Sequence, residues 1–101
     1  MSEELVYVKV FRYGKDVLVA VCDADLLGKT LKDGDLEVYI DEKFFKGSLV
    51  TIEKALSILE TATVANLFGD KIVNEAKKRG LIHANAIIRI SGVSHAQFIE
   101  L

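Results

Sequence analysis

The first part of the chain has the clearest alternation of apolar and polar positions. Valines recur at every second position within residues 5–12, a period of two that is typical of a strand with one buried face. Residues 13–16 form a turn signal, and residues 17–22 are an almost continuous apolar run, typical of a strand buried on both faces. The pattern therefore predicts a hairpin whose second strand lies in the centre of a sheet.

The following segment is more polar. Residues 23–34 are predicted to form a loop with a short helical turn at 25–27, and residues 32–35 form a second turn signal. Apolar and polar residues then alternate over 36–40, which predicts a third strand with one solvent-exposed face. The polar and aromatic segment 41–48 is expected to pack over an edge of the sheet.

The period becomes helical after Thr51, because apolar residues recur at i, i+3, i+4 and i+7 at Ile52, Ala55, Leu56 and Leu59. Either Ser48 or Thr51 can cap this helix, since a short hydroxyl accepts hydrogen bonds from the exposed N–H groups of its first turn. A second helix is predicted over about residues 70–79, with Asp70 as its N-cap. Gly80 supplies a left-handed residue after its end.

Two further strands are predicted at residues 86–90 and 97–101, which gives the order β-β-β-α-α-β-β. The fold class that follows is α+β, with a mostly antiparallel sheet of about five strands and two helices on one face. The valines of the first strand should be more buried than Tyr7 and Phe11. We expect one core, which contains Val6, Val8, Val10, Val17, Val19, Val21, Val38, Ile52, Leu56, Leu59, Ile72, Val73, Ile88 and Ile90.

Composition narrows the class of protein. The 101 residues correspond to one domain, residues 1–101, and 50% apolar with 28% charged residues exclude a disordered chain. With 13 basic and 15 acidic residues the net charge is −2, which excludes a wholesale polyelectrolyte binder but permits a local basic patch. One cysteine allows no internal disulfide, the acidic start is unlike a signal peptide, and no apolar run approaches the ~18–20 residues of a membrane span. A cytoplasmic protein without a membrane partner is expected.

Known cofactor motifs give no assignment. The chain has neither the G-x-x-x-x-G-K-[ST] nor the G-x-G-x-x-G pattern that cradles phosphates. A structural zinc site needs about four nitrogen or sulfur ligands at short spacing, and Cys22, His83 and His95 are scattered. The sequence therefore predicts no cofactor and no metal site.

Three polar clusters, at residues 22–29, 65–70 and 92–97, contain the candidate site. Their short polar side chains fall at the predicted ends of elements, where functional groups can converge without disrupting the core. We expect them to line one shared depression, with His95 hydrogen-bonded to one of the others and a carboxylate partner favouring imidazolium. The candidate site residues are Asp23, Asn66, His95 and Gln97.

Each of these residues also has a plain structural interpretation. Asp23 can cap the turn at residues 26–27, Asn66 suits a left-handed turn, and His95 can hydrogen-bond to backbone. Cys22 continues an apolar run and is interpreted first as a small buried hydrophobic residue, with a nucleophilic cysteine as the alternative.

A second candidate surface is basic. Lys77, Lys78 and Arg79 end the second predicted helix, and Arg89 together with Lys71 and His83 extends them to a modest basic face that suits an anion or RNA. The alternative is a solvated helix end, where cations are favoured by the helix dipole. The halves of the chain differ in charge: residues 1–50 carry 7 basic and 10 acidic groups, and the rest carry 6 and 5.

Four stretches together resemble an archaeal family known as domain of unknown function 424: residues 19–23, 26–29, 65–69 and 90–97. The resemblance covers about residues 7–101. The family has proline where this chain has Ser94, and proline would hold the approach to His95 more rigidly. The resemblance implies a small cytosolic archaeal protein and transfers no mechanism.

Three functions follow from these observations. A compact chain without a catalytic signature favours a binding module, with RNA or a ribosome-associated protein of the translation machinery as its partner. The alternatives are a small enzyme that uses His95 with Asp23 or Cys22, and a protein–protein adaptor that docks through an exposed Phe44–Phe45 segment.

Overall fold

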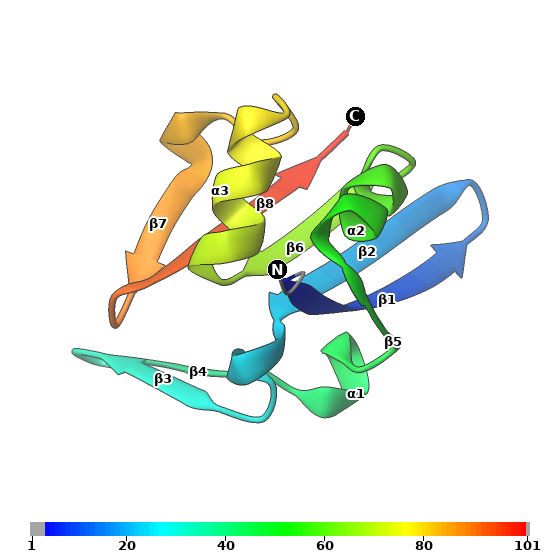
Figure 1. Cartoon of the computed structure of the whole chain (residues 1–101). Coiled ribbons are helices and arrows are strands. Elements are labelled where there is room, and N and C mark those ends of the chain that lie inside the picture. The colour runs from blue at the N-terminus through cyan, green and yellow to red at the C-terminus, as the bar shows by residue number, and fades with distance from the viewer. Residues whose placement is uncertain (1–3, 101) are drawn as a thin grey trace.

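The computed structural model describes residues 4–100, and its main element is a six-stranded sheet. The strand order is β5-β1-β2-β6-β8-β7 (Figure 1). All neighbouring pairs are antiparallel except β2 and β6, which are parallel. The strands are β1 (Leu5–Tyr13), β2 (Asp16–Asp23), β5 (Ser48–Thr51), β6 (Val64–Phe68), β7 (Ile87–Ile90) and β8 (Val93–Ile99).

Two helices, α2 (Ile52–Leu59) and α3 (Asp70–Lys78), cover one face of this sheet (Figure 1). The expected cap of α2 is confirmed, since the Thr51 hydroxyl accepts a hydrogen bond of 3.2 Å from the N–H of Lys54. The apolar stripe of α2 packs on the buried valines of β1 and β2. Burial of these side chains holds the helices in place.

The opposite face of the sheet carries smaller elements. A short 3₁₀ turn, η1 (Ala24–Leu26), leads into a separate two-stranded hairpin formed by β3 (Thr30–Asp33) and β4 (Leu36–Tyr39), and α1 (Glu42–Phe45) follows. Elsewhere in the chain, a second 3₁₀ turn, η2 (Ala84–Ala86), precedes the edge strand β7.

The α+β class with a mostly antiparallel sheet is confirmed, but within residues 4–100 the main sheet has six strands instead of about five, and there are three α-helices instead of two. The single expected core is two clusters on the two faces of the sheet. The helix-side cluster contains most of the expected residues, and Val38 and Ile90 belong to the hairpin-side cluster. Val6 and Val8 are more buried than Tyr7 and Phe11, as expected. The prediction that Val10 and Ile88 belong to the core is wrong, because these residues are 36% and 53% exposed.

The sequence pattern did not predict several of the observed elements. β3, β5, β6 and α1 were not expected, and β8 begins at Val93, well before the expected start at residue 97. Leu101, the expected last residue of that strand, lies outside the described residues. Short strands carry little periodicity of their own, and pairing with β2 and β8 makes residues 64–68 a strand where turn residues suggested a loop.

None of the helices formed by residues 4–100 combines the length and the apolar character that crossing a membrane requires.

Candidate functional site

The alternation of β2, β6 and β8 sends the four candidate residues to different faces of the sheet. Asp23 faces α3, since its carboxylate accepts hydrogen bonds from that helix. Asn66 and His95 line a cavity on the hairpin side, and Gln97 shares the face of its cross-strand partner Asn66. The expectation of one depression shared by all four is therefore wrong for Asp23, which faces the other side, and for Gln97, which does not line the cavity.

Asp23, the last residue of β2, caps the N-terminus of α3 with its side chain. It is 5% exposed, and its two carboxylate oxygens accept from the N–H groups of Lys71 at 3.0 Å and Ile72 at 3.1 Å. A Cβ on Gly69 would lie 2.2 Å from the Asp23 carboxyl carbon, so the close approach requires glycine. Burial raises the pKa of Asp23 above its ordinary value, and the two backbone hydrogen bonds oppose that shift.

The two caps predicted from the sequence are corrected accordingly. Asp23 makes no side-chain cap to η1, the turn it was expected to cap. Asp70 is the first helical residue of α3, and it accepts from the Ser94 N–H at 2.9 Å. The hydrogen bonds from Ser94 lower the pKa of Asp70. Both carboxylates tie α3 to neighbouring strands, which is a structural role.

The hairpin-side cavity has a volume of about 450 Å³. Four elements besides α1 contribute to its wall: β4, β6, β7 and β8. Most of the lining is aliphatic or aromatic, with few polar groups. The lining residues are Leu36, Val38, Tyr39, Asp41, Phe44, Phe45, Asn66, Phe68, Ile88, Ile90 and His95.

His95 is held in one orientation on the cavity floor. Its Nδ1 lies 2.8 Å from the carbonyl oxygen of Leu67, and its ring stacks on Phe68 with centroids 4.0 Å apart. A carbonyl oxygen only accepts, so Nδ1 carries the hydrogen. Burial lowers the pKa of His95, while the bond to Leu67 acts in the opposite direction. The ring is therefore neutral at pH 7 and its Nε2 is an acceptor, which corrects the expected imidazolium hydrogen-bonded to another candidate residue.

Asn66 has a buried atom without a partner. Within the described residues, its Oδ1 is the one buried side-chain nitrogen or oxygen that lacks a hydrogen bond. Asn66 lies opposite Gln97 on β8, and His95 is its diagonal cross-strand neighbour. The Cα atoms of such diagonal neighbours are roughly 7–8 Å apart. Gln97 itself is exposed and does not line the cavity. The candidate site is thus Asn66 and His95 with the apolar wall around them.

Cys22 lies in the hairpin-side cluster and is fully buried. Burial, followed by the charges of Asp23 and Asp25, raises the pKa of its thiol to about 12. The thiol is therefore neutral at pH 7, and the interpretation as a buried small hydrophobic residue fits.

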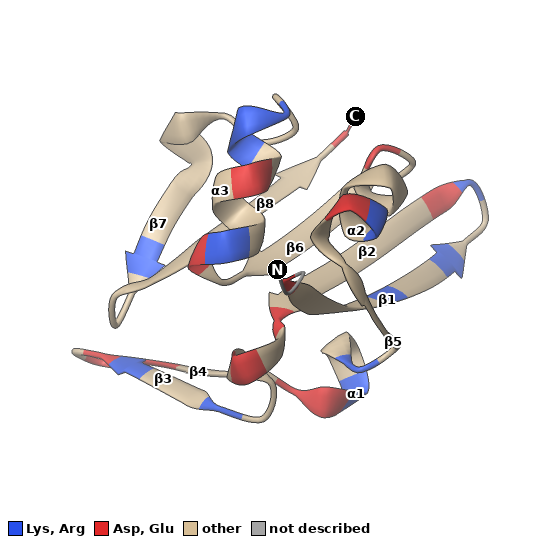
Figure 2. Cartoon of the chain, in the orientation of Figure 1, with Lys and Arg blue, Asp and Glu red and all other residues tan. Residues whose placement is uncertain are grey.

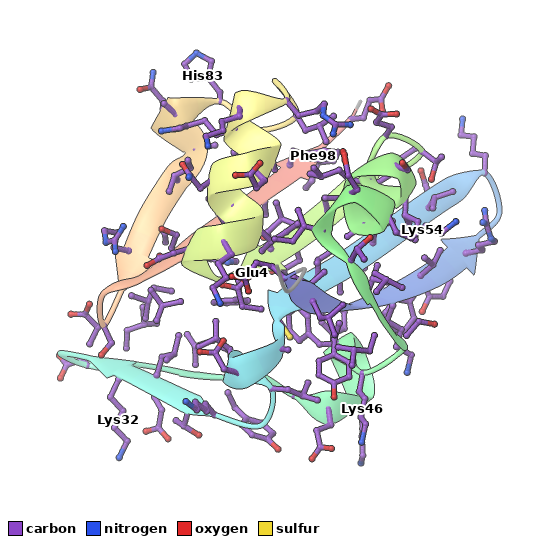
Figure 3. The ribbon with its side chains drawn as sticks, viewed as in Figure 1. Glu4, Lys32, Lys46, Lys54, His83 and Phe98 are labelled. Carbon is purple, nitrogen blue, oxygen red and sulfur yellow. The ribbon has the colours of Figure 1, made fainter. Side chains whose placement is uncertain are left out.

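The structure divides the expected basic face. Lys77, Lys78 and Arg79 lie at the end of α3, whereas Arg89 pairs with Asp70 at its start. At a rise of 1.5 Å per residue, the two ends are roughly 10–14 Å apart. In Figure 2 the lysine and arginine positions at the upper end of α3, drawn in blue, are well separated from the blue position on β7. His83 lies at the upper end of the molecule in Figure 3, on the side where α3 ends.

Most of these cations already have acidic neighbours. Arg79 pairs with Glu53 and, at 3.6 Å, with Glu60, and Lys78 lies 3.3 Å from Glu75. Lys71 pairs with Glu4 at 2.9 Å. These pairs are exposed and weak, but they reduce the positive potential that an RNA backbone would meet.

The Phe44–Phe45 segment is not an exposed docking surface. Phe45 is 3% exposed and packs edge-on against Phe68, with ring centroids 5.8 Å apart. Phe44 is half-buried and stacks on Phe11 at 5.4 Å. Both rings belong to the wall of the hairpin-side cavity.

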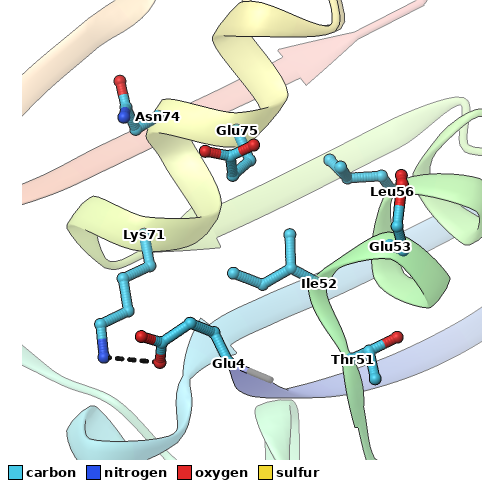
Figure 4. Close-up of a pocket in the computed structure, with 8 residues that line it drawn as sticks. All are labelled: Glu4, Thr51, Ile52, Glu53, Leu56, Lys71, Asn74 and Glu75. Atoms are coloured by element: carbon cyan, nitrogen blue, oxygen red, sulfur yellow. Dashed lines mark hydrogen bonds and ion pairs between the residues drawn. The ribbon is translucent and has the colours of Figure 1, made fainter. Parts of the chain in front are cut away.

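A second hollow, of about 420 Å³, lies between α2 and α3. Ile52 and Leu56 point into it from α2, and the Lys71–Glu4 ion pair closes one end (Figure 4). Its other carboxylates, Glu53 and Glu75, have cationic partners, so this groove contains no polar group that requires a ligand. No set of three or more His, Cys, Asp or Glu side chains within residues 4–100 is placed to hold a metal ion.

The comparisons with known proteins agree with this fold. A family profile described as "Protein of unknown function (DUF424)" matches residues 11–101. The chain belongs to the DUF424 family. An uncharacterised conserved protein from the archaeon Methanopyrus kandleri has a similar crystal structure, with a TM-score of 0.80 and 27% sequence identity. The likeness covers 93% of this chain and 90% of that one, and no curated protein matches.

The family expected from the four sequence stretches is therefore confirmed, and DUF424 brings no assigned activity. Sequence reasoning found Asn66 and His95 but missed the wall around them, notably Tyr39, Phe68 and Ile88. One signal was present: Asp33-Gly34 between alternating apolar residues is typical of a tight hairpin and could have predicted the β3–β4 pair, although not its place over the sheet.

Proposed function

We propose that this DUF424 protein is a binding module that holds a small organic ligand in the hairpin-side cavity, against Asn66 and His95. The buried, unpartnered Oδ1 of Asn66 carries the proposal. A buried polar atom without a hydrogen bond costs about 1–3 kcal/mol, and such a cost is typical of sites where a ligand completes the bonding.

The shape of the cavity supports the same function. Its volume of about 450 Å³ falls within the range of roughly 300–1,000 Å³ usual for small-molecule sites. A mostly apolar wall with a few polar groups is also usual, because the wall provides burial and the polar groups orient the ligand. Asn66 and His95 lie on adjacent paired strands, so their spacing is set by the sheet.

The other expected functions gain less support. Association with RNA or a ribosome-associated protein stays a prediction, although the basic residues are divided and largely paired. For the enzyme, Asp23 caps α3 on the other face and the Cys22 thiol is neutral, so His95 lacks both expected catalytic partners. For the adaptor, Phe45 is buried.

The proposal is tested by titrating isotope-labelled protein with a panel of neutral, acidic and basic aromatic compounds of one or two rings. We expect some of them to shift the NMR signals of the His95 ring and to leave those of the exposed His83 unchanged. Ile88 is 53% exposed at the cavity wall, so Ile88→Trp should fill the cavity and abolish the shift. Ile99→Trp, at a 68% exposed position that does not line the cavity, is the matched control. A panel that leaves His95 unmoved would refute the proposal.

A further inference from the structure

Two side chains that line the cavity, Asn66 and His95, each carry an acceptor atom without a hydrogen-bond donor among residues 4–100. Asn66 Oδ1 is an amide oxygen without a partner. His95 uses Nδ1 to donate to Leu67, so its free nitrogen, Nε2, accepts while the ring is neutral. A ligand that satisfies either atom must contribute an N–H or an O–H group.

The charge of the wall excludes anionic ligands. Asp41 is the one charged residue among those that line the cavity, and no lysine or arginine is among them. Burying a carboxylate or a phosphate there would leave its charge without a partner, which is strongly unfavourable. A neutral or cationic ligand meets no such penalty.

The wall also favours a flat ligand. Phe44, Phe45 and Phe68 form a chain of ring contacts along it, with centroids 5.0 Å and 5.8 Å apart. Ile88 and Ile90 come from β7 beside the stacked pair of Phe68 and His95. Flat aromatic molecules gain large contact areas against such rings and branched side chains, at little cost in conformational entropy.

We infer that the ligand class of this cavity is a flat heteroaromatic molecule that donates a hydrogen bond through a ring N–H and carries no negative charge. This inference rests on the proposed function, because it specifies the ligand of the same cavity. It predicts discrimination between molecules of one shape that differ only in the donor or in charge.

Three compounds test the class: indole, benzofuran and indole-3-carboxylate. Benzofuran has the shape of indole with an oxygen in place of the N–H, and indole-3-carboxylate adds a negative charge. We expect indole to shift the His95 ring signals, benzofuran to bind roughly two- to tenfold more weakly, and the carboxylate weakest of the three. Asn66→Leu should remove most of the preference of the cavity for indole over benzofuran. The exposed Asn74→Leu, on α3, should keep that preference.

The outcomes separate the ligand class from the proposed function. Equal or tighter binding of benzofuran or of the carboxylate overturns the class while the cavity stands as a binding site. Failure of indole, when another compound of the panel shifts His95, overturns the class in the same way. An unmoved His95 with every compound overturns both. A preference for indole that survives in Asn66→Leu overturns Asn66 Oδ1 as the acceptor and leaves His95 Nε2 as the atom that binds the donor.

Discussion

Asp23 and Asn66 are both short polar residues in the interior of the sheet, but they differ in hydrogen bonding. Both oxygens of Asp23 accept from the backbone of α3, while Asn66 Oδ1 has no partner. A satisfied buried group stabilises a fold and an unsatisfied one destabilises it. Replacing the two residues should therefore change stability in opposite directions.

The first prediction concerns Asn66. We expect Asn66→Leu to raise the free energy of unfolding by about 0.5–2 kcal/mol, because it removes an unsatisfied buried oxygen and adds apolar contact. Urea denaturation measures the change, with Asn74→Leu at an exposed position as the control. A loss of stability in Asn66→Leu would mean that the amide makes a stabilising contact within the protein.

The second prediction concerns Asp23. We expect Asp23→Ala to lower the free energy of unfolding by about 2 kcal/mol, because two N–H groups of the first turn of α3 lose their acceptor. Asp25→Ala removes a nearby exposed carboxylate and should change stability by less than about 0.5 kcal/mol. Similar losses in both variants would assign the effect to charge instead of capping.

The third prediction concerns His95 and pH. Burial lowers its pKa in the folded state, so between that lowered value and about pH 6.5 the unfolded chain binds more protons. The free energy of unfolding should therefore fall as the pH decreases from about 7 towards 5. His95→Asn keeps a donor near Nδ1 and should lose this component of the slope. His83→Asn, at an exposed position, should keep it. Identical slopes in wild type and His95→Asn would contradict the lowered pKa.

At the scale of elements, the β3–β4 hairpin decides whether a cavity exists. It forms its own sheet and contributes Leu36, Val38 and Tyr39 to the wall. Near its tip, the Asp33 carboxylate accepts from the N–H of Ser91 at 2.8 Å, which joins the hairpin to the turn between β7 and β8. Ser91 has a positive φ of 52°, and this turn presents its N–H to Asp33.

The fourth prediction tests that contact. We expect Asp33→Ala to increase amide hydrogen exchange several-fold over residues 30–39, because the exposed hairpin loses its hydrogen bond to Ser91. The six-stranded sheet should exchange as before. Asp35→Ala, in the same turn, is the control. Exchange that rises throughout the chain would show that the hairpin does not open independently.

At the scale of the whole molecule, the sheet separates two apolar clusters. The helix-side cluster includes the fully buried Val19, and the hairpin-side cluster includes Cys22 and Phe68. The charges are spread over exposed ion pairs, each of which contributes little to stability. Stability should therefore depend mainly on the buried residues of the central strands.

The fifth prediction compares two valines of the first hairpin. We expect Val19→Ala to cost about 1–3 kcal/mol through lost burial and a residual cavity, because Val19 is 0% exposed. Val10→Ala, at a position 36% exposed, should cost less than about 1 kcal/mol. Urea denaturation of both variants measures the difference. Equal costs would contradict the difference in burial between the two positions.

Elements with a strong period could be predicted from the sequence alone. The β1–β2 hairpin, the central place of β2, both long helices and the Thr51 cap follow from periodicity and capping, which are local properties. The stretches at residues 65–69 and 90–97 also led to the DUF424 family. Asn66 and His95 could be named as candidates because polar residues stand out beside apolar runs.

Tertiary structure alone decided which of those residues meet. A side-chain direction in a strand reverses with every residue, so without β6 and the true start of β8 the face of Asn66 or His95 could not be assigned. The partners of Asp23 come from α3, and the cavity wall comes from β4, α1 and β7, all distant in sequence. Such contacts depend on sheet order and packing, which no local pattern encodes. The sequence by itself determined the strongly periodic elements, and long-range pairing determined the site.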